Sequence, residues 1–321
     1  MEIDEICRPI REYLNEAEER LKSARNVDSP GLFELLDYGL KGGGKRIRPI
    51  LVLLSGRLFD GSSDHLMPMA LAVELTHLAT LVHDDTIDNS SVRWGRPTIN
   101  TLWGVEQAVL LGDYLFARAG ELTASTENIR VIKLLSKTLM IITGGEVAQA
   151  RSAFNLEQTQ EHYFHRISGK TASLFVLATE SGAALAGAPE ESIQILQEYG
   201  NNLGIAFQIV DDILDFISSE EEMGKPVGSD LTQGTLTLPG MLLLEQYPED
   251  NPIKKMFQER GGGEYIARAI DMVRNSPIID QCFDIATRYR NRACRRLDQL
   301  PDNEFRQSLY GLADFIITRR K

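Results

Sequence analysis

Two long segments, residues 65–88 and 190–217, constrain the fold most strongly. In each, apolar residues recur at the three- and four-residue steps of a helix, and each ends in an acidic motif. The first motif reads HDDTID and the second VDDILD, so both contain the pattern DDxxD. A helical period puts the first and third carboxylates on one face, with the middle one close beside them. Carboxylates at a helix C-terminus oppose the helix dipole and repel one another, so we expect a cation at each motif.

The six motif aspartates are the predicted metal ligands. Oxygen-only ligands favour Mg²⁺, which keeps several waters and usually shares its shell with substrate phosphates. Both helices are apolar on most sides with one polar stripe, and buried charge without partners is very costly, so the stripes should face a shared polar cavity. The alternative is that each motif is a solvated helix end. The predicted ligands are Asp84, Asp85, Asp88, Asp211, Asp212 and Asp215.

Helical periodicity marks most of the remaining chain and predicts an all-α protein. We find no convincing alternating strand pair and no Asn-Gly or Asp-Gly hairpin signal. The Gly- and Pro-rich breaks are too short to be interdomain linkers, so we expect residues 1–321 to form a single helical domain. The further predicted helices are 4–24, 46–58, 101–121, 128–151, 170–186, 264–274, 280–299 and 303–318.

Bulk composition excludes several classes of protein. The net charge of −12 argues against a nucleic-acid surface, and 43% hydrophobic with 25% charged residues is ordinary for a soluble globular protein. The three cysteines lack metal-ligand spacing and are expected to be reduced, structural thiols. The first residues are acidic, unlike a signal peptide, and no run of about 18 apolar residues predicts a transmembrane segment. We therefore expect a cytoplasmic protein.

Basic segments match the acidic motifs. The sequence KGGGKRIRP from Lys41 is a glycine loop that opens a helix, and its amides and cations suit a phosphate. Arg93 follows the first motif, Lys170 begins another helix, and Lys225 follows the second motif. A solvated basic loop and single surface lysines are the alternatives. Together with the metal sites, these cations predict an anionic, phosphate-bearing ligand.

These residues in combination resemble the trans-isoprenyl diphosphate synthases, or polyprenyl synthetases. The resemblance runs from near Gly42 to Pro239, with a fainter match at the C-terminal arginines. Its motifs are GGKRIRP, the His77 before HDDxxD, RxGxPT, GExxQ, KTA, FQxxDDxxD and GKxxGxDL. The resemblance implies an all-α bundle around a deep central cavity, usually a homodimer. Members of the family condense an allylic diphosphate with isopentenyl diphosphate.

The resemblance also implies residue roles. Three Mg²⁺ ions would hold the allylic diphosphate between the two DDxxD motifs. The cations that would neutralise its remaining charge are Arg93, Lys170 and Lys225. Thr171 and Gln208 would stabilise the allylic cation through their oxygen dipoles, and the departing diphosphate would remove the final proton. Isopentenyl diphosphate would bind Lys45, Arg48 and His77. The tail Arg319, Arg320 and Lys321 would close over this site, with a frayed tail as the alternative.

Two positions depart from the family pattern. Trp94 stands where the family usually has a second arginine, and Thr235 stands where it usually has a lysine. A charged hydrogen bond contributes roughly 1.5–3 kcal/mol, so each departure weakens binding or rate unless Arg96 or another residue compensates. A non-catalytic partner subunit is therefore one alternative. However, such subunits generally lose the motif aspartates, and this chain keeps all six.

Product length depends on the wall below the first motif. Ala79 and Thr80 lie about one helical turn, roughly 5.4 Å, beneath the carboxylates, and Thr76 lies about two turns beneath. These side chains are small where short-product members commonly place an aromatic residue, so we expect a product longer than twenty carbons. A geranylgeranyl-length synthase and a terpene cyclase or head-to-head synthase are the alternatives. A floor would otherwise come from Leu110, Leu111, Tyr114, Leu115, Phe116, Met140 or Phe154, for which core packing is the alternative.

Overall fold

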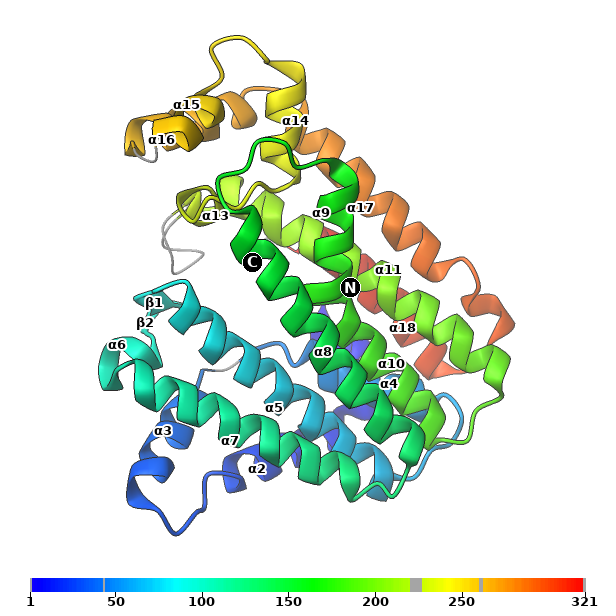
Figure 1. The fold of residues 1–321 in the computed structure, drawn as a ribbon. Coiled ribbons are helices and arrows are strands. Elements are labelled where there is room, and N and C mark those ends of the chain that lie inside the picture. Colours follow the sequence, from blue (N-terminus) through cyan, green and yellow to red (C-terminus); the bar gives the residue numbers. More distant parts are fainter. Residues whose placement is uncertain (1, 43, 220–226, 260–261, 320–321) are drawn as a thin grey trace.

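The computed structural model describes residues 2–42, 44–219, 227–259 and 262–319, and it is almost entirely helical (Figure 1). The predicted all-α class is confirmed. The N-terminal half contains α1 (Ile3–Ile6), α2 (Arg11–Ser23), α3 (Pro30–Leu40), α4 (Ile47–Arg57), α5 (Ser63–Ile87), α6 (Ile99–Trp103), α7 (Val105–Ala124) and α8 (Ile129–Ser152). The C-terminal half contains α9 (Gln160–Ile167), α10 (Ser173–Leu185), α11 (Glu190–Ile217), α13 (Ser229–Thr232), α14 (Leu238–Gln246), α15 (Pro252–Glu259), α16 (Gly263–Arg274), α17 (Ile278–Cys294) and α18 (Glu304–Thr318).

The core is built around the two motif helices, α5 and α11. The larger hydrophobic cluster includes most of α4 and α5, and the smaller one lies between α11 and α13–α17. The first half of α11 belongs to the larger cluster and its second half to the smaller one, so α11 joins them. The second acidic motif therefore lies on a helix that is held on several sides.

Helix α5 is the one described helix that is long and apolar enough to cross a membrane. In its most apolar window, 67% of the residues are buried inside the protein. Packing against α4, α7 and α10 explains this composition, because a helix buried on all sides needs apolar residues all round. Its start is defined by Ser62, whose side chain accepts a hydrogen bond from the Asp64 backbone amide.

Five of the described helices were not predicted from the sequence: α3, α9, α13, α14 and α15. Proline usually indicates a break in a helix, but α3, α14 and α15 each have proline in the first turn, where its missing N–H costs nothing. Tertiary contacts then stabilise these short helices, as the burial of Leu35 and Leu36 in α3 shows. The predicted helix 4–24 is also wrong as one element, since a 3₁₀ turn at Arg8–Ile10, containing Pro9, divides it.

A small hairpin contradicts the prediction of no strand pair. Strands β1 (Val92–Arg93) and β2 (Arg96–Pro97) pair antiparallel, with Arg93 opposite Arg96. The two turn residues, Trp94 and Gly95, have φ angles of 51° and 73°. Positive φ at both positions is typical of a two-residue hairpin turn whose twist matches the strands. The signal was missed because a tryptophan occupies a position at which asparagine or aspartate is usual.

Candidate active site

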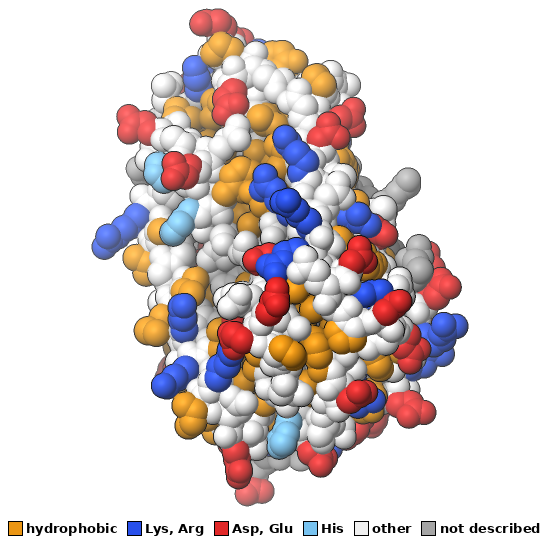
Figure 2. Space-filling model, turned by 90° about the vertical axis from the view of Figure 1, so that its right-hand side faces the viewer, with side chains coloured by type: hydrophobic (Ala, Val, Ile, Leu, Met, Phe, Trp, Pro, Cys, Tyr) orange, Lys and Arg blue, Asp and Glu red, His pale blue; other side chains and the backbone are white. Residues whose placement is uncertain are grey.

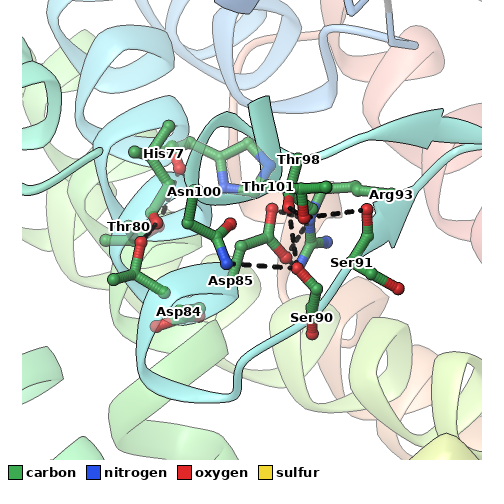
Figure 3. Close-up of polar contacts among 12 residues, drawn as sticks. His77, Thr80, Asp84, Asp85, Ser90, Ser91, Arg93, Thr98, Asn100 and Thr101 are labelled. Carbon is green, nitrogen blue, oxygen red and sulfur yellow. Dashed lines mark hydrogen bonds and ion pairs between the residues drawn. The ribbon is translucent and has the colours of Figure 1, made fainter. Parts of the chain in front are cut away.

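The first motif ends α5 and is braced by the hairpin that follows it. Asp85 is 6% exposed, and Arg93 Nε donates to both of its carboxylate oxygens at 2.9 and 2.8 Å. Asp85 points toward Arg93, whereas Asp84 points away from it (Figure 3). Burial raises the pKa of Asp85 although Arg93 opposes this, and burial likewise raises the pKa of Asp88. Burial therefore makes ionisation of these two carboxylates costlier, and Arg93 offsets part of that cost at Asp85.

The loop between the motif and the hairpin is held by side chains just beyond it. The Thr98 hydroxyl donates to the Ser90 carbonyl at 2.7 Å, and the Asn100 amide donates to the same oxygen at 3.3 Å. The Thr98 backbone amide donates to the Ser91 carbonyl at 3.1 Å (Figure 3). These bonds give the threonine of the RxGxPT motif a structural role. They fix the loop that places Arg93 against Asp85.

Lys170 and Thr171 are adjacent residues that reach the two motif helices. They lie in a single π-helical turn, Ser168–Ala172, of the kind often found at functional sites. Lys170 Nζ lies 2.6 Å from Glu146 Oε1 and 3.6 Å from Asp84 Oδ2 on α5. The Thr171 hydroxyl donates to Gln208 Oε1 on α11 at 2.6 Å. Both motifs are therefore within reach of one short segment.

The charges around Lys170 shift the pKa values of the groups involved. Burial disfavours the ammonium, but Asp84 and Glu146 outweigh burial and raise the pKa of Lys170. Burial and then repulsion from Asp84 raise the pKa of Glu146. Glu146 lies in the GExxQ motif, and sequence reasoning assigned it no role. Only the fold shows that it shares a lysine with the first motif.

The three aspartates of the second motif have different surroundings. Asp212 is 2% exposed, and its oxygens accept hydrogen bonds from the Tyr163 hydroxyl at 2.6 Å and the Gln208 amide at 2.8 Å. Burial, then repulsion from Asp230, raises the pKa of Asp212 to about 8. Asp215 is also buried and accepts hydrogen bonds from the Ser229 hydroxyl and the Asp230 amide. Asp211 is the most exposed of the three.

The C-terminal arginine Arg319 covers the second motif. Its guanidinium pairs with Asp211, donates to the Phe207 carbonyl at 2.9 Å and lies 3.7 Å from the centroid of the Phe207 ring. The alternative of a frayed tail is therefore not observed at this residue. Arg320 and Lys321 lie outside the described residues, as does the predicted site residue Lys225.

The glycine loop and α4 bring the remaining predicted residues together. Arg48 is 9% exposed and lies 5.2 Å from the centroid of the Phe175 ring, and burial lowers its pKa to about 10. Its Nε is buried without a hydrogen-bond partner among the described residues. Burial, then Arg48 and Arg93, lower the pKa of His77, which keeps the imidazole neutral at pH 7. Lys45 is exposed and its Nζ lies 5.3 Å from the centroid of the Phe315 ring.

The two unusual positions, Trp94 and Thr235, lie in turns. Trp94 is 50% exposed at the tip of the hairpin. Arg96, the proposed substitute for the missing arginine, lies 4.2 Å from the centroid of the Tyr38 ring and is thereby directed toward α3. The Thr235 amide donates to the Asp230 carbonyl at 2.8 Å in the turn between α13 and α14.

The wall below the first motif contains one fully buried and one partly buried small side chain. Ala79 is fully buried, and the Thr80 hydroxyl donates to the His77 carbonyl at 2.7 Å. Among the predicted floor residues, Leu111 and Leu115 are buried in the core. Leu110 and Met140 are instead 53% and 69% exposed, so they lie at the surface of this chain and not in its interior. Phe154 packs against Phe257 in the smaller cluster.

The carboxylates suit a hard divalent cation by their chemistry. Within the described parts of the chain, no three His, Cys, Asp or Glu side chains are gathered closely enough to hold a metal. The aspartates pair instead with cations of the protein: Arg93, Lys170 and Arg319. Burial raises the pKa values of Asp85, Asp88 and Asp212, so their charged forms are stabilised by a nearby cation, which a bound metal ion would supply.

Comparisons with known proteins agree with this geometry. The family model described as polyprenyl synthetase matches residues 29–273. Component 2 of a heptaprenyl diphosphate synthase from Geobacillus stearothermophilus is 40% identical over 299 residues, which cover 93% of both chains. An octaprenyl diphosphate synthase from Haemophilus influenzae is 32% identical and covers 99% of this chain and 98% of its own.

Solved structures agree as well. A polyprenyl synthase from Caulobacter crescentus, complexed with calcium and isoprenyl diphosphate, has a TM-score of 0.95 at 35% identity and covers 100% of this chain and 98% of its own. A decaprenyl diphosphate synthase from Rhodobacter capsulatus has a TM-score of 0.92 at 35% identity and covers 100% of both chains. The paired acidic motifs, the cations beside them and these matches together place the chain in the polyprenyl synthetase family of prenyl transferases.

Proposed function

We propose that this chain joins an allylic diphosphate to isopentenyl diphosphate, head to tail, and makes an all-trans polyprenyl diphosphate longer than twenty carbons. One observation supports this most strongly. Lys170 approaches Asp84 of the first motif, while its neighbour Thr171 contacts Gln208 beside the second. A substrate between the two motifs would therefore meet an ammonium and a hydroxyl at adjacent positions. The small side chains at Ala79 and Thr80 and the medium- and long-chain names of several relatives support the product length.

The allylic diphosphate would be held by metal and protein cations. We propose that Mg²⁺, three ions per site, binds at the carboxylates of the two motifs, with Asp212 and Asp215 the least accessible of them. When bound, the metal neutralises charge that develops on the leaving diphosphate. Arg93 and Lys170 would add fixed positive charge, and Lys225 would join them. The Thr171 and Gln208 oxygens would face the allylic cation, which is stabilised by dipoles held in place before the reaction.

Isopentenyl diphosphate would bind at Lys45, Arg48 and His77. The buried Arg48 Nε, which has no hydrogen-bond partner in the described residues, supports this because an unpaired buried donor is costly unless a ligand satisfies it. A neutral His77 donates or accepts a hydrogen bond without adding charge. The departing diphosphate would remove the final proton, so no protein base is required.

The test is product analysis with purified chain, labelled isopentenyl diphosphate, farnesyl diphosphate and Mg²⁺. We expect a ladder of products beyond twenty carbons, lost in Asp84→Asn. The control Asp113→Asn removes a carboxylate on α7 whose side chain is 66% exposed and should change nothing. A stop at twenty carbons would instead identify a geranylgeranyl-length synthase.

A second candidate is one subunit of a two-component synthase, because two of the similar relatives are named as component 2 of a heptaprenyl diphosphate synthase. Products that appear only with a second chain would favour it.

We propose a homodimer, supported by exposed apolar side chains on α7 and α8: Val105, Val109, Leu110, Met140 and Val147. Sedimentation of the purified chain as a monomer would contradict this.

We propose that the enzyme works in the cytoplasm and does not bind nucleic acid. All three cysteines are buried and unpaired, which is usual for proteins kept reduced. The face on which α17 lies carries acidic and basic side chains intermixed (Figure 2). Fractionation of cells expressing the chain would test the location.

A further inference from the structure

Four side chains from three elements form a continuous hydrogen-bonded series beside the second motif. The Tyr163 hydroxyl on α9 donates to Asp212 Oδ2 at 2.6 Å. Gln208 Nε2 donates to Asp212 Oδ1 at 2.8 Å, and the Thr171 hydroxyl donates to Gln208 Oε1 at 2.6 Å. Tyr163 is fully buried, Asp212 is 2% exposed and Thr171 is 8% exposed. Water therefore has little access to replace the partners at Tyr163, Asp212 and Thr171, whereas Gln208 is partly exposed.

The series has a direction that its chemistry enforces. A glutamine amide presents donors on one side and an acceptor on the other. Once Asp212 is ionised, as binding of the proposed metal requires, it only accepts hydrogen bonds, so the NH₂ group of Gln208 faces Asp212 and the Gln208 oxygen faces Thr171. The Thr171 hydroxyl must then donate its proton to Gln208, which leaves its lone pairs directed elsewhere. If the amide turned over, Thr171 would accept from it and lose that orientation.

Tyr163 is the terminal residue of the series and fixes the orientation of the Asp212 carboxylate. Its hydroxyl binds the Asp212 oxygen that Gln208 does not use, so the carboxylate presents its other oxygen to the amide. We infer that Tyr163 is a positioning residue for prenyl transfer, which acts through Asp212 and Gln208 to aim the Thr171 oxygen at the allylic cation. The inference rests on the proposed function. It gives Asp212 a role in orienting the amide that is separate from metal binding.

The chain supplies a matched pair of variants, Tyr163→Phe and Tyr199→Phe. Tyr199 is also fully buried, and its hydroxyl donates to the Leu309 carbonyl at 2.7 Å. Each variant deletes one buried tyrosine hydroxyl, so both should lower the melting temperature by a similar amount. Only Tyr163 is linked to Thr171. The comparison therefore separates positioning from stability.

The experiment measures kcat, both KM values and the binding of two unreactive allylic analogues in the presence of Mg²⁺. One analogue carries an ammonium group where the cation would develop. The other is a thiolodiphosphate, which has no positive charge at that position. For Tyr163→Phe we expect kcat to fall about 10- to 100-fold with KM within twofold, because the oriented dipole acts mainly on the cation. The ammonium analogue should bind correspondingly more weakly, and the affinity for the thiolodiphosphate should be unchanged. Tyr199→Phe should leave all five quantities within twofold.

Equal effects of the two variants, or a Tyr163→Phe enzyme with unchanged kcat, would overturn the inference. In a Thr171→Val background, Tyr163→Phe should lower kcat little further, because the effects of changing residues in one hydrogen-bonded series are not additive. An inactive wild-type chain would instead refute the proposed function, so the two failures are distinguishable.

Discussion

Removal of the Lys170 charge tests the site most directly. Lys170 Nζ lies 3.6 Å from Asp84 and 2.6 Å from Glu146, and the three side chains are 24%, 17% and 18% exposed. At an effective dielectric constant of about 20, unit charges 3.6 Å apart attract by about 4–5 kcal/mol. Desolvation offsets much of this, and breaking a fully buried pair costs about 3–5 kcal/mol. For these partly exposed groups we expect Lys170→Met to lower the free energy of unfolding by about 2 kcal/mol.

The same change should lower kcat by about 10²–10³-fold, the usual effect of removing one group that stabilises developing charge. Thermal unfolding with and without Mg²⁺ and product formation from farnesyl diphosphate are the assays. Because a bound cation replaces the missing charge, Mg²⁺ should restore much of the lost stability. Lys255→Met is the control, since its ion pair with Asp250 is at the surface and contributes about 0–1 kcal/mol. A loss of stability that Mg²⁺ leaves unchanged, with kcat within twofold of wild type, would refute this reasoning.

Three further predictions concern α5 and its contact with α7. Burial raises the folded-state pKa of Asp85 and Asp88 above their unfolded values, so ionising them lowers stability as pH rises through that interval. Mg²⁺ binds the ionised forms and should therefore raise the melting temperature more at a pH above that interval than at a pH within it, and an equal rise would contradict this. Thr80→Phe should shorten the product, since it fills the wall about one turn below the motif, and an unchanged product ladder would exclude this wall. Gly112→Ala should destabilise the protein by about 1–3 kcal/mol in denaturant unfolding, because its Cβ would lie 2.1 Å from His83 Nε2, and His83→Ala should remove most of that cost.

The sequence by itself determined the helical class and both motif helices. The predicted range 190–217 coincides with α11, and the predicted 65–88 differs from α5 by two residues at its start and one at its end. Helix formation in these segments depends on local hydrogen bonds and on an apolar pattern that recurs over many turns, both of which are readable from the chain. The motifs also indicated the family, which the comparisons confirmed. The hairpin and the short helices α3, α9, α13, α14 and α15 could not be predicted because tertiary packing stabilises them more than their own sequence does.

Only the tertiary structure decided how the charged groups are paired. The sequence indicated carboxylates and cations but not that Lys170 bridges Glu146 and Asp84, or that Arg319 reaches Asp211. It also placed the six aspartates in one class, whereas the fold buries Asp212 against Tyr163 and leaves Asp211 more exposed. Such partners are far apart along the chain, and their meeting depends on how helices pack rather than on any local spacing. The chemistry of each group is a property of its residue type, but its charge state, orientation and role follow from burial and neighbours, which exist only once the chain has folded.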